Sequence, residues 1–172
     1  GVHGRVALIV GGGDDHAGHS GNSHWLRTAR TYRNGLTAVL ADKLDREHIF
    51  RAMQNRQVYA TTGKRILLEF SAGGIEMGQE GIFQDGFCIT CSVHGTAEIS
   101  RITLIRNGQD IHSVTPDNYD AEVSFEENSA FENISMKGER ADAPFVYYYI
   151  RVEQADGHMA WSSPVWFTQG SY

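Results

Sequence analysis

The sequence predicts an α+β protein in which a short α/β segment precedes an antiparallel β-sandwich of the immunoglobulin or fibronectin type. Two observations support this prediction. Before residue 63, apolar runs that suit buried strands flank one well-capped helix. After residue 64, the apolar pattern changes to a period of two over several short segments separated by turn residues, which is typical of sandwiches. The expected division is therefore residues 1–63 and residues 64–172.

Three strands are predicted in the first segment. The apolar run Val6–Val10 comes first, and Gly11–Gly13 then let the backbone turn tightly. A polar stretch at 17–34 is expected to form a long loop before Leu36–Ala41, a second strand of the buried type. The third strand is Val58–Gly63, which runs into a turn.

A helix is predicted between the second and third strands. Asp45 is a good N-cap, and Leu44 and Ile49 occupy the two positions of a hydrophobic staple. Ile49, Phe50 and Met53 are expected to form the apolar face of this helix. Its start is therefore clearly marked in the sequence.

The second segment is predicted to consist of short strands. Asn107-Gly108 and Asp156-Gly157 sit where two-residue hairpin turns need positive φ. Six runs have the alternation of half-buried strands: Ile66–Phe70, Phe87–Val93, Ile99–Arg106, Ala121–Phe125, Phe145–Gln154 and Met159–Phe167. This spacing predicts an antiparallel sandwich that stands apart from the first segment.

Strand alternation also decides how we interpret two motifs. Cys88 and Cys91 have the spacing of a zinc or redox motif, but an offset of three on a strand puts the two thiols on opposite faces. Tyr147 and Tyr149 could form a stacking platform for sugars or bases, with Tyr148 turned toward the core. A structural cysteine pair and a half-buried outer sheet face are the favoured interpretations.

Composition excludes some classes of protein. Fifteen basic against twenty-one acidic residues give a net charge of -6 without a basic cluster, which argues against a nucleic-acid surface. No apolar run approaches the roughly 20 residues of a membrane span. Two cysteines are too few for a disulfide framework, which favours a reducing, cytoplasmic compartment. The chain opens on Gly1 without an initiator methionine, so a fragment or a processed piece is expected.

The loop after Gly13 carries candidate metal ligands. Asp14 and His16 are of the types that divalent metals prefer, and His19 and His24 lie close by in the sequence. Arg27 could contact an anionic group of a substrate. The alternative is a solvated Gly-Asp turn in a polar loop, which the same residues would also form.

These segments together resemble a known superfamily. Gly12–His16 resembles the closing Asp-x-His metal motif of the PHP (polymerase and histidinol phosphatase) superfamily. Three further stretches are similar to a large bacterial branch of it: Gly35–Leu40, Val58–Gly63 and Ala160–Trp166. The resemblance implies a distorted α/β barrel that holds zinc, manganese or iron and hydrolyses phosphoesters with a metal-bound hydroxide. It implies that Asp14 and His16 are metal ligands and that Asp15 is an outer-sphere group.

The resemblance has one departure with consequences for function. Members begin with His-x-Asp-x-His, and this chain contains no such motif. We therefore expect the C-terminal part of a longer hydrolase, namely the last barrel segments in 1–63 and an accessory sandwich in 64–172, inactive alone. In the parent protein the substrate would be a small phosphorylated or other hydrolysable molecule. An apolar strand without its barrel is an aggregation hazard, which favours a homo-oligomer.

A second hypothesis comes from a different functional class. In it the chain is a non-catalytic β-sandwich module that binds a sugar or a protein partner. Asp14 and His16 are then ordinary loop residues.

Overall fold

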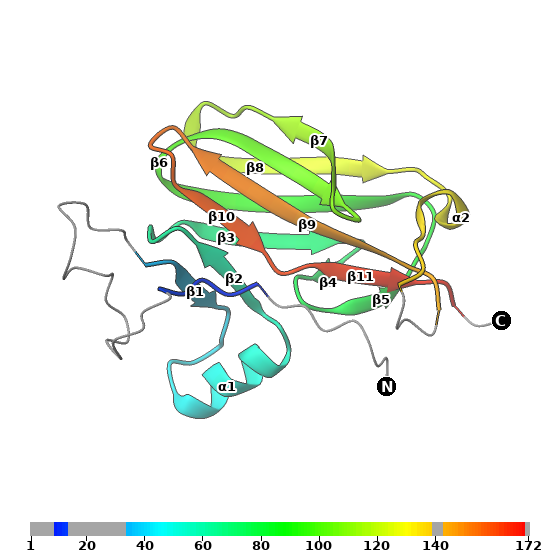
Figure 1. Cartoon of the computed structure of the whole chain (residues 1–172), viewed down its shortest axis with the longest axis horizontal. Coiled ribbons are helices and arrows are strands. Elements are labelled where there is room, and N and C mark those ends of the chain that lie inside the picture. The colour runs from blue at the N-terminus through cyan, green and yellow to red at the C-terminus, as the bar shows by residue number, and fades with distance from the viewer. Residues whose placement is uncertain (1–8, 14–33, 139–142, 171–172) are drawn as a thin grey trace.

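One long strand organises the fold. In the computed structural model, which describes residues 9–13, 34–138 and 143–170, β6 (Phe87–Arg106) runs through the whole curled sheet (Figure 1). Its first half pairs with β3 (Leu67–Ala72) and β8 (Asn118–Glu127). Its second half pairs with β7 (Gln109–Val114) and β9 (Phe145–Gln154). All four pairings are antiparallel, so β6 belongs to both layers of the sandwich.

The change of layer occurs near Gly95. The pairing of β6 with β8 shifts register between His94 and Ile99, where the strand bends. A Cβ at Gly95 would lie 2.5 Å from the carbonyl oxygen of Ala97 and 3.1 Å from that of Tyr119. Since real Cβ atoms do not approach that closely, the bend requires glycine at this position.

A second group of strands extends the sheet beyond β9. β10 (Met159–Ser162) pairs with β9 and with β2 (Val58–Thr61), which in turn pairs with β1 (Leu36–Val39). β11 (Val165–Thr168) pairs with β9 and, in parallel, with β5 (Glu80–Ile82). Hydrogen bonding is thus continuous from β1 to the sandwich.

The predicted strand Met159–Phe167 is interrupted between β10 and β11. Pro164 has no N–H to offer the ladder, and two buried serine hydroxyls beside it supply hydrogen bonds instead. Ser162 Oγ accepts from the amide of Ile150 at 2.9 Å, and Ser163 Oγ donates to the carbonyl of Val58 at 2.5 Å. The break therefore leaves these backbone groups paired.

The core lies between the two layers. Alternation sends one set of β9 side chains inward, where each is fully buried: Val146, Tyr148, Ile150 and Val152. On β6, the same period of two buries Cys91 and exposes Cys88, and neither thiol forms a disulfide. Burial raises the pKa of Cys91 to about 12. The opposite-face prediction for the cysteines is confirmed.

Short elements complete the description. The helix α1 (Arg46–Gln54) joins β1 to β2, and α2 (Phe131–Ile134) follows β8. A tight hairpin connects β3 to β4 (Ile75–Glu76). Both residues of the Asn107-Gly108 turn have positive φ, as predicted, whereas in Asp156-Gly157 only the glycine does.

The fold confirms the β-rich, antiparallel part of the predicted class. The predicted segment of an α/β barrel is not seen among the described residues. Ile9 and Val10 lie outside any strand, and the rest of the expected Val6–Val10 strand falls outside the described residues. The second predicted strand forms as β1, but it is only partly buried and antiparallel to β2. The division at residue 63 stays a prediction, although β2–β10 pairing crosses it.

The end of α1 gives the first testable prediction. Gly78 has φ +85°, and a Cβ there would collide with the carbonyl of Arg56, just after the helix. Gly86 has a similar φ of +71° with nothing near its Cβ position. We expect Gly86→Ala to cost about 1–2 kcal/mol through backbone strain alone. Gly78→Ala should cost about 3 kcal/mol or more, because the collision adds to the strain.

Urea unfolding of both variants measures this difference. Equal losses of unfolding free energy in the two variants would contradict a tight contact between Gly78 and Arg56.

Candidate interaction surface

The outer side of α1 carries exposed apolar side chains. Asp45 caps the helix as predicted, since its carboxylate accepts from the amide of His48 at 2.9 Å. Phe50 is 61% exposed and Met53 is 42% exposed, three residues apart on the side of the helix that faces away from the sheet. Leu44 is 95% exposed, so it does not form the predicted staple with Ile49.

The predicted apolar face of this helix is therefore corrected. Ala52 is buried and Ile49 is half-buried, so these two residues form the inner face. Phe50 and Met53 belong to a second, neighbouring apolar stripe. A helix that packs against the protein on one side needs a single apolar stripe. The second stripe on this nine-residue helix was therefore a signal in the sequence of an exposed apolar surface, and the sequence analysis missed it.

Arg56 fixes the position of the helix. It lies two residues after the end of α1 and has φ 60°, a conformation that costs energy for any residue with a Cβ. Its guanidinium donates to the carbonyl of Gly78 at 2.7 Å and to the carboxylate of Glu80 at 3.0 Å. It also lies 5.3 Å from the ring centroid of Trp166, at cation–π distance. These contacts offset the strain and attach the end of α1 to β5 and β11.

The N-terminal segment lies beside β1. The amide and the carbonyl of Gly11 both bond the Thr37 hydroxyl at 3.0 Å, and Gly35 N donates to the carbonyl of Gly12. A Cβ at Gly11 would collide with the backbone of Leu36, so only glycine permits this approach. Val10 and Leu36, at the two sides of this contact, expose 55% and 38% of their surface.

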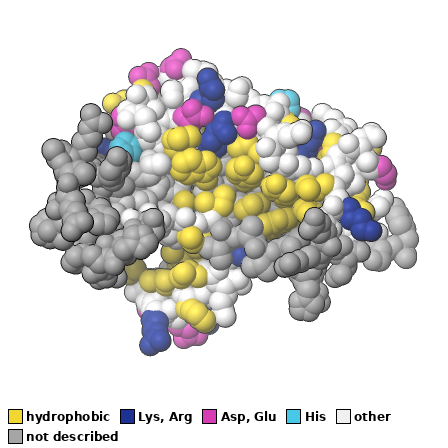
Figure 2. Space-filling model, in the orientation of Figure 1, with side chains coloured by type: hydrophobic (Ala, Val, Ile, Leu, Met, Phe, Trp, Pro, Cys, Tyr) yellow, Lys and Arg dark blue, Asp and Glu magenta, His cyan; other side chains and the backbone are white. Residues whose placement is uncertain are grey.

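A second apolar area lies on the outer face of β9. Figure 2 shows hydrophobic side chains gathered over β9 and β10. Tyr147 and Tyr149 point outward and are half-buried, with ring centroids 6.4 Å apart and nearly parallel planes. Trp161 on β10 is also half-buried. The outward placement of the two tyrosines is as predicted, and partial burial on an outer sheet face is ordinary.

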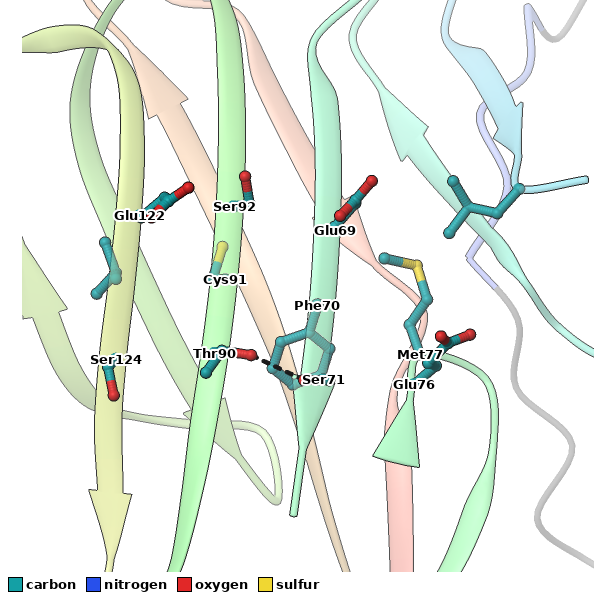
Figure 3. Close-up of a pocket in the computed structure, with 12 residues that line it drawn as sticks. Glu69, Phe70, Ser71, Glu76, Met77, Thr90, Cys91, Ser92, Glu122 and Ser124 are labelled. Atoms are coloured by element: carbon teal, nitrogen blue, oxygen red, sulfur yellow. Dashed lines mark hydrogen bonds between the residues drawn. The ribbon is translucent and has the colours of Figure 1, made fainter. Parts of the chain in front are cut away.

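A hollow lies on the face of β3, β6 and β8. This groove has a volume of about 720 Å³, within the range of ligand pockets. Figure 3 shows Glu69, Ser92 and Glu122 on the three strands, with the Ser71 and Thr90 hydroxyls bonded to each other at 2.8 Å. The groove is thus acidic and rich in hydroxyls, and its lining combines ordinary outward-facing side chains with the edge of the core.

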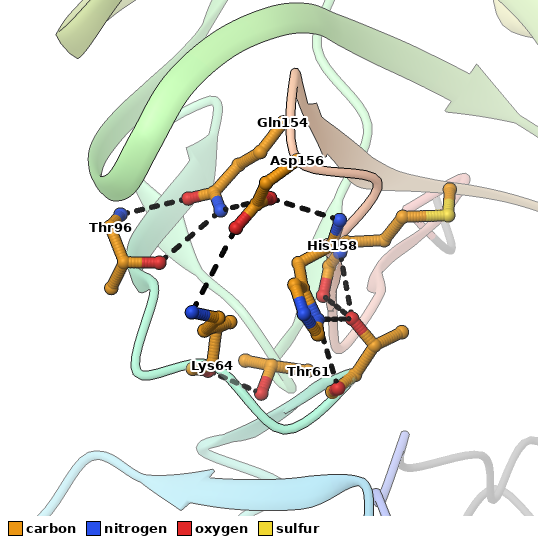
Figure 4. A network of polar contacts seen from close by, with 8 residues as sticks. Thr61, Lys64, Thr96, Gln154, Asp156 and His158 are labelled. Atoms are coloured by element: carbon orange, nitrogen blue, oxygen red, sulfur yellow. Dashed lines mark hydrogen bonds and ion pairs between the residues drawn. The ribbon is translucent and has the colours of Figure 1, made fainter. Parts of the chain in front are cut away.

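A polar network joins the turns at one end of the sandwich. Asp156 accepts from the amide of His158 and lies 3.9 Å from the Lys64 ammonium group, while Gln154 accepts from the amide of Thr96 (Figure 4). His158 Nδ1 lies 2.9 Å from the hydroxyl of Thr62. These bonds connect the end of β2 to the β9–β10 hairpin and to the bend in β6, so the network is structural.

One buried ion pair fixes the other end of β6. The carboxylate of Glu127 accepts from Arg106 at 2.7 Å and from the Tyr148 hydroxyl at 2.9 Å. Burial opposes ionisation of Glu127, but hydrogen bonds from Ser129, Arg106 and Tyr148 outweigh it and lower the pKa of its carboxyl. Burial, together with the nearby charge of Glu127, raises the pKa of Tyr148 above its ordinary range. Glu127 is therefore ionised at neutral pH, and Tyr148 is a neutral donor.

The structure does not test the predicted metal ligands. All six residues named from the sequence lie outside the described residues: Asp14, Asp15, His16, His19, His24 and Arg27. Within 9–13, 34–138 and 143–170, no group of three or more His, Cys, Asp or Glu side chains is placed to hold a metal ion. Metal binding at Asp14 and His16 therefore has no support from the described part of the chain.

Of the helices in the described ranges, none is long and apolar enough to cross a bilayer.

The described part is thus a β-rich domain with an apolar helix surface. The model of a protein family described as "Protein of unknown function (DUF3604)" matches residues 11–97, and the chain belongs to that family. It is 36% identical over 168 residues to an uncharacterized protein of Chlamydia muridarum and to one of Chlamydia trachomatis serovar D. A Chlamydia pneumoniae protein is 35% identical over 169 residues.

These relatives are much longer than the chain. Each alignment covers 94% of this chain and 27% of the relative, so the chain spans about a quarter of their length. No solved structure matches the chain.

The family match overturns the resemblance to the PHP superfamily. Identifying the chain as the C-terminal part of a PHP-like hydrolase is wrong, since the matching family is DUF3604. The hydrolase, phosphoesterase and metal-binding assignments that the resemblance implied are withdrawn with it. The suggestion from residue types alone that Asp14 and His16 are metal ligands stays an untested prediction. The physical reason is the weakness of the signal, because an Asp-x-His after an apolar run also describes an ordinary polar turn.

The ion pair of Glu127 gives the second prediction. Because the folded-state pKa of Glu127 is lowered, its stabilising contribution is present above its unfolded-state pKa of about 4.3 and is lost as the pH falls through the folded-state value. Glu127→Gln should lower the unfolding free energy at pH 7 by about 2 kcal/mol. The difference from the wild type should shrink as the pH falls below about 4.

Urea unfolding between pH 7 and pH 3 checks this expectation. The control is Glu126→Gln, an exposed neighbour on the same strand, which should change stability little at either pH. A Glu127→Gln loss that stays constant across this pH range would refute the role of the charge.

Proposed function

We propose that this chain is a non-catalytic β-sandwich domain that binds a protein partner through the outer surface of α1. The observation that supports this is the exposure of Phe50 and Met53 on a helix whose end is held in place by Arg56. An apolar patch on a rigid element is typical of an interaction site, whereas single exposed apolar residues are ordinary. Leu44, which precedes the N-cap of this helix, is also exposed and adds apolar surface near its start.

The energetics favour a partner of substantial size. Burying a Phe, Leu or Met side chain that was exposed contributes about 1.5–3 kcal/mol. Covering all three side chains would therefore supply several kcal/mol toward association, part of which is offset by lost translational and rotational freedom. A hollow of about 310 Å³ beside Phe50, lined by Arg46 and Glu47, gives a partner side chain a place to insert.

The chemistry of this surface favours protein over sugar. Sugar hydroxyls lose hydrogen bonds to water on binding, so a sugar site needs several polar groups directed at one place. The exposed side chains of Leu44, Phe50 and Met53 contain no hydrogen-bond donor and no strong acceptor. Burial of such side chains against another apolar surface is how protein interfaces form.

Site-specific photocrosslinking tests the proposal. With p-benzoylphenylalanine in place of Phe50, we expect one protein to crosslink in cells of the natural source. Unlabelled wild-type chain should compete the crosslink away, and Phe50→Glu should not. The control position is Leu67 on β3, which is 58% exposed but lies outside the α1 surface.

Purified partner then gives the magnitude. Phe50→Glu should weaken binding at least about tenfold, equivalent to about 1.4 kcal/mol, and Leu67→Glu should leave the Kd unchanged. If the crosslinker captured the same proteins in equal yield from position 50 and from position 67, α1 would not be the binding surface.

A further inference from the structure

We infer that the partner of the α1 surface is a folded polypeptide equivalent to the part of the chlamydial relatives that lies outside their alignment with this chain. This inference rests on the proposed function and names the partner. The relatives hold a region that is 36% identical to this chain within a polypeptide nearly four times as long. Regions of one polypeptide commonly pack against each other, so an exposed apolar surface on one region is suited to contact the other.

The distribution of exposed apolar side chains supports this partner. Five of the nine large exposed apolar side chains of the described residues come from the first 53 positions: Val10, Leu36, Leu44, Phe50 and Met53. The other four are scattered singly over the sandwich: Leu67, Ile82, Tyr119 and Met136. The concentration is therefore specific to the segment 9–13, β1 and α1.

These elements lie on one side of the molecule. Figure 1 shows the segment 9–13 crossing β1, with α1 below it. The hydrogen bonds between Gly11 and Thr37 hold the segment on β1, and the bond from Leu40 N to the Gln57 carbonyl closes the loop that contains α1. Exposed apolar side chains on three neighbouring elements are better suited to a folded domain than to a short peptide, since a stable interface buries about 800 Å² on each partner.

The charges around the patch indicate what kind of binding to expect. Arg46, Glu47 and Arg51 flank it, and Arg51 donates to Glu47 at 2.6 Å. Charges of both signs give no strong field of one sign, so apolar burial should dominate the affinity. Binding should then depend little on salt between about 0.1 and 0.5 M, unlike an electrostatic interface.

The test combines this chain with the Chlamydia trachomatis relative. The relative is expressed without its aligned 168 residues, and this remainder is titrated with the chain by calorimetry. We expect a 1:1 complex whose Kd rises at least tenfold with Phe50→Glu and with Met53→Glu. Leu67→Glu is the matched control and should leave the Kd unchanged. The aligned region of the relative, expressed alone, serves as the positive control.

A second measurement covers the case in which the remainder does not fold alone. In the intact relative, the helix that aligns with α1 should exchange amide hydrogens at least tenfold more slowly than in the isolated aligned region. Equal exchange in both would overturn the inference, as would a folded remainder that binds the relative's own region but not this chain.

Two further outcomes separate this inference from the proposed function. Position-50 crosslinking to an unrelated protein, together with no binding to the remainder, would overturn the named partner and leave the proposed function standing. A concentration-dependent dimer of the chain that Phe50→Glu converts to monomer would show that a second copy covers the surface. That result would also overturn the inference.

Discussion

Both layers of the sandwich depend on the continuity of β6. This strand supplies hydrogen bonds to β3 and β8 before its bend and to β7 and β9 after it. Gly95 permits the bend, and the Glu127–Arg106 pair ties the far end of β6 to β8. Because the two layers share one backbone, a change at the bend alters the packing of both. The outer faces, and with them the candidate sites, are positioned by this strand.

Much of the sandwich could be predicted because its strands alternate clearly. The bounds of β9 were predicted to the residue, and the inward set of Val146, Tyr148 and Ile150 followed from the period of two. The sequence did not indicate that Phe87–Val93 and Ile99–Arg106 form a single strand, since a bend at glycine looks like a turn. Pairing between β2 and β10 is also hidden, because about 100 residues separate the two strands and no local pattern reports such contacts.

The candidate surface was harder to predict than the fold. Asp45 marked the start of α1, but a pattern of apolar residues does not say which stripe of a helix meets the sheet. Ala52 and Ile49 occupy that side, and Phe50 and Met53 remain exposed. The metal hypothesis drew on a short motif, whose chance occurrence is frequent, and its residues lie outside the described part of the chain. Long periodic segments were thus informative about the strands, whereas the prediction made from the short motif stays untested.

The contact between Arg56 and Trp166 couples the position of α1 to tryptophan fluorescence. Indole fluorescence responds to a charged group over its ring, and the guanidinium of Arg56 lies 5.3 Å from that of Trp166. Since Trp166 is buried in β11, its emission reports little of the solvent and much of this one neighbour. With Trp25 and Trp161 replaced by Phe, Trp166 would therefore be an intrinsic probe of how α1 packs on the sheet.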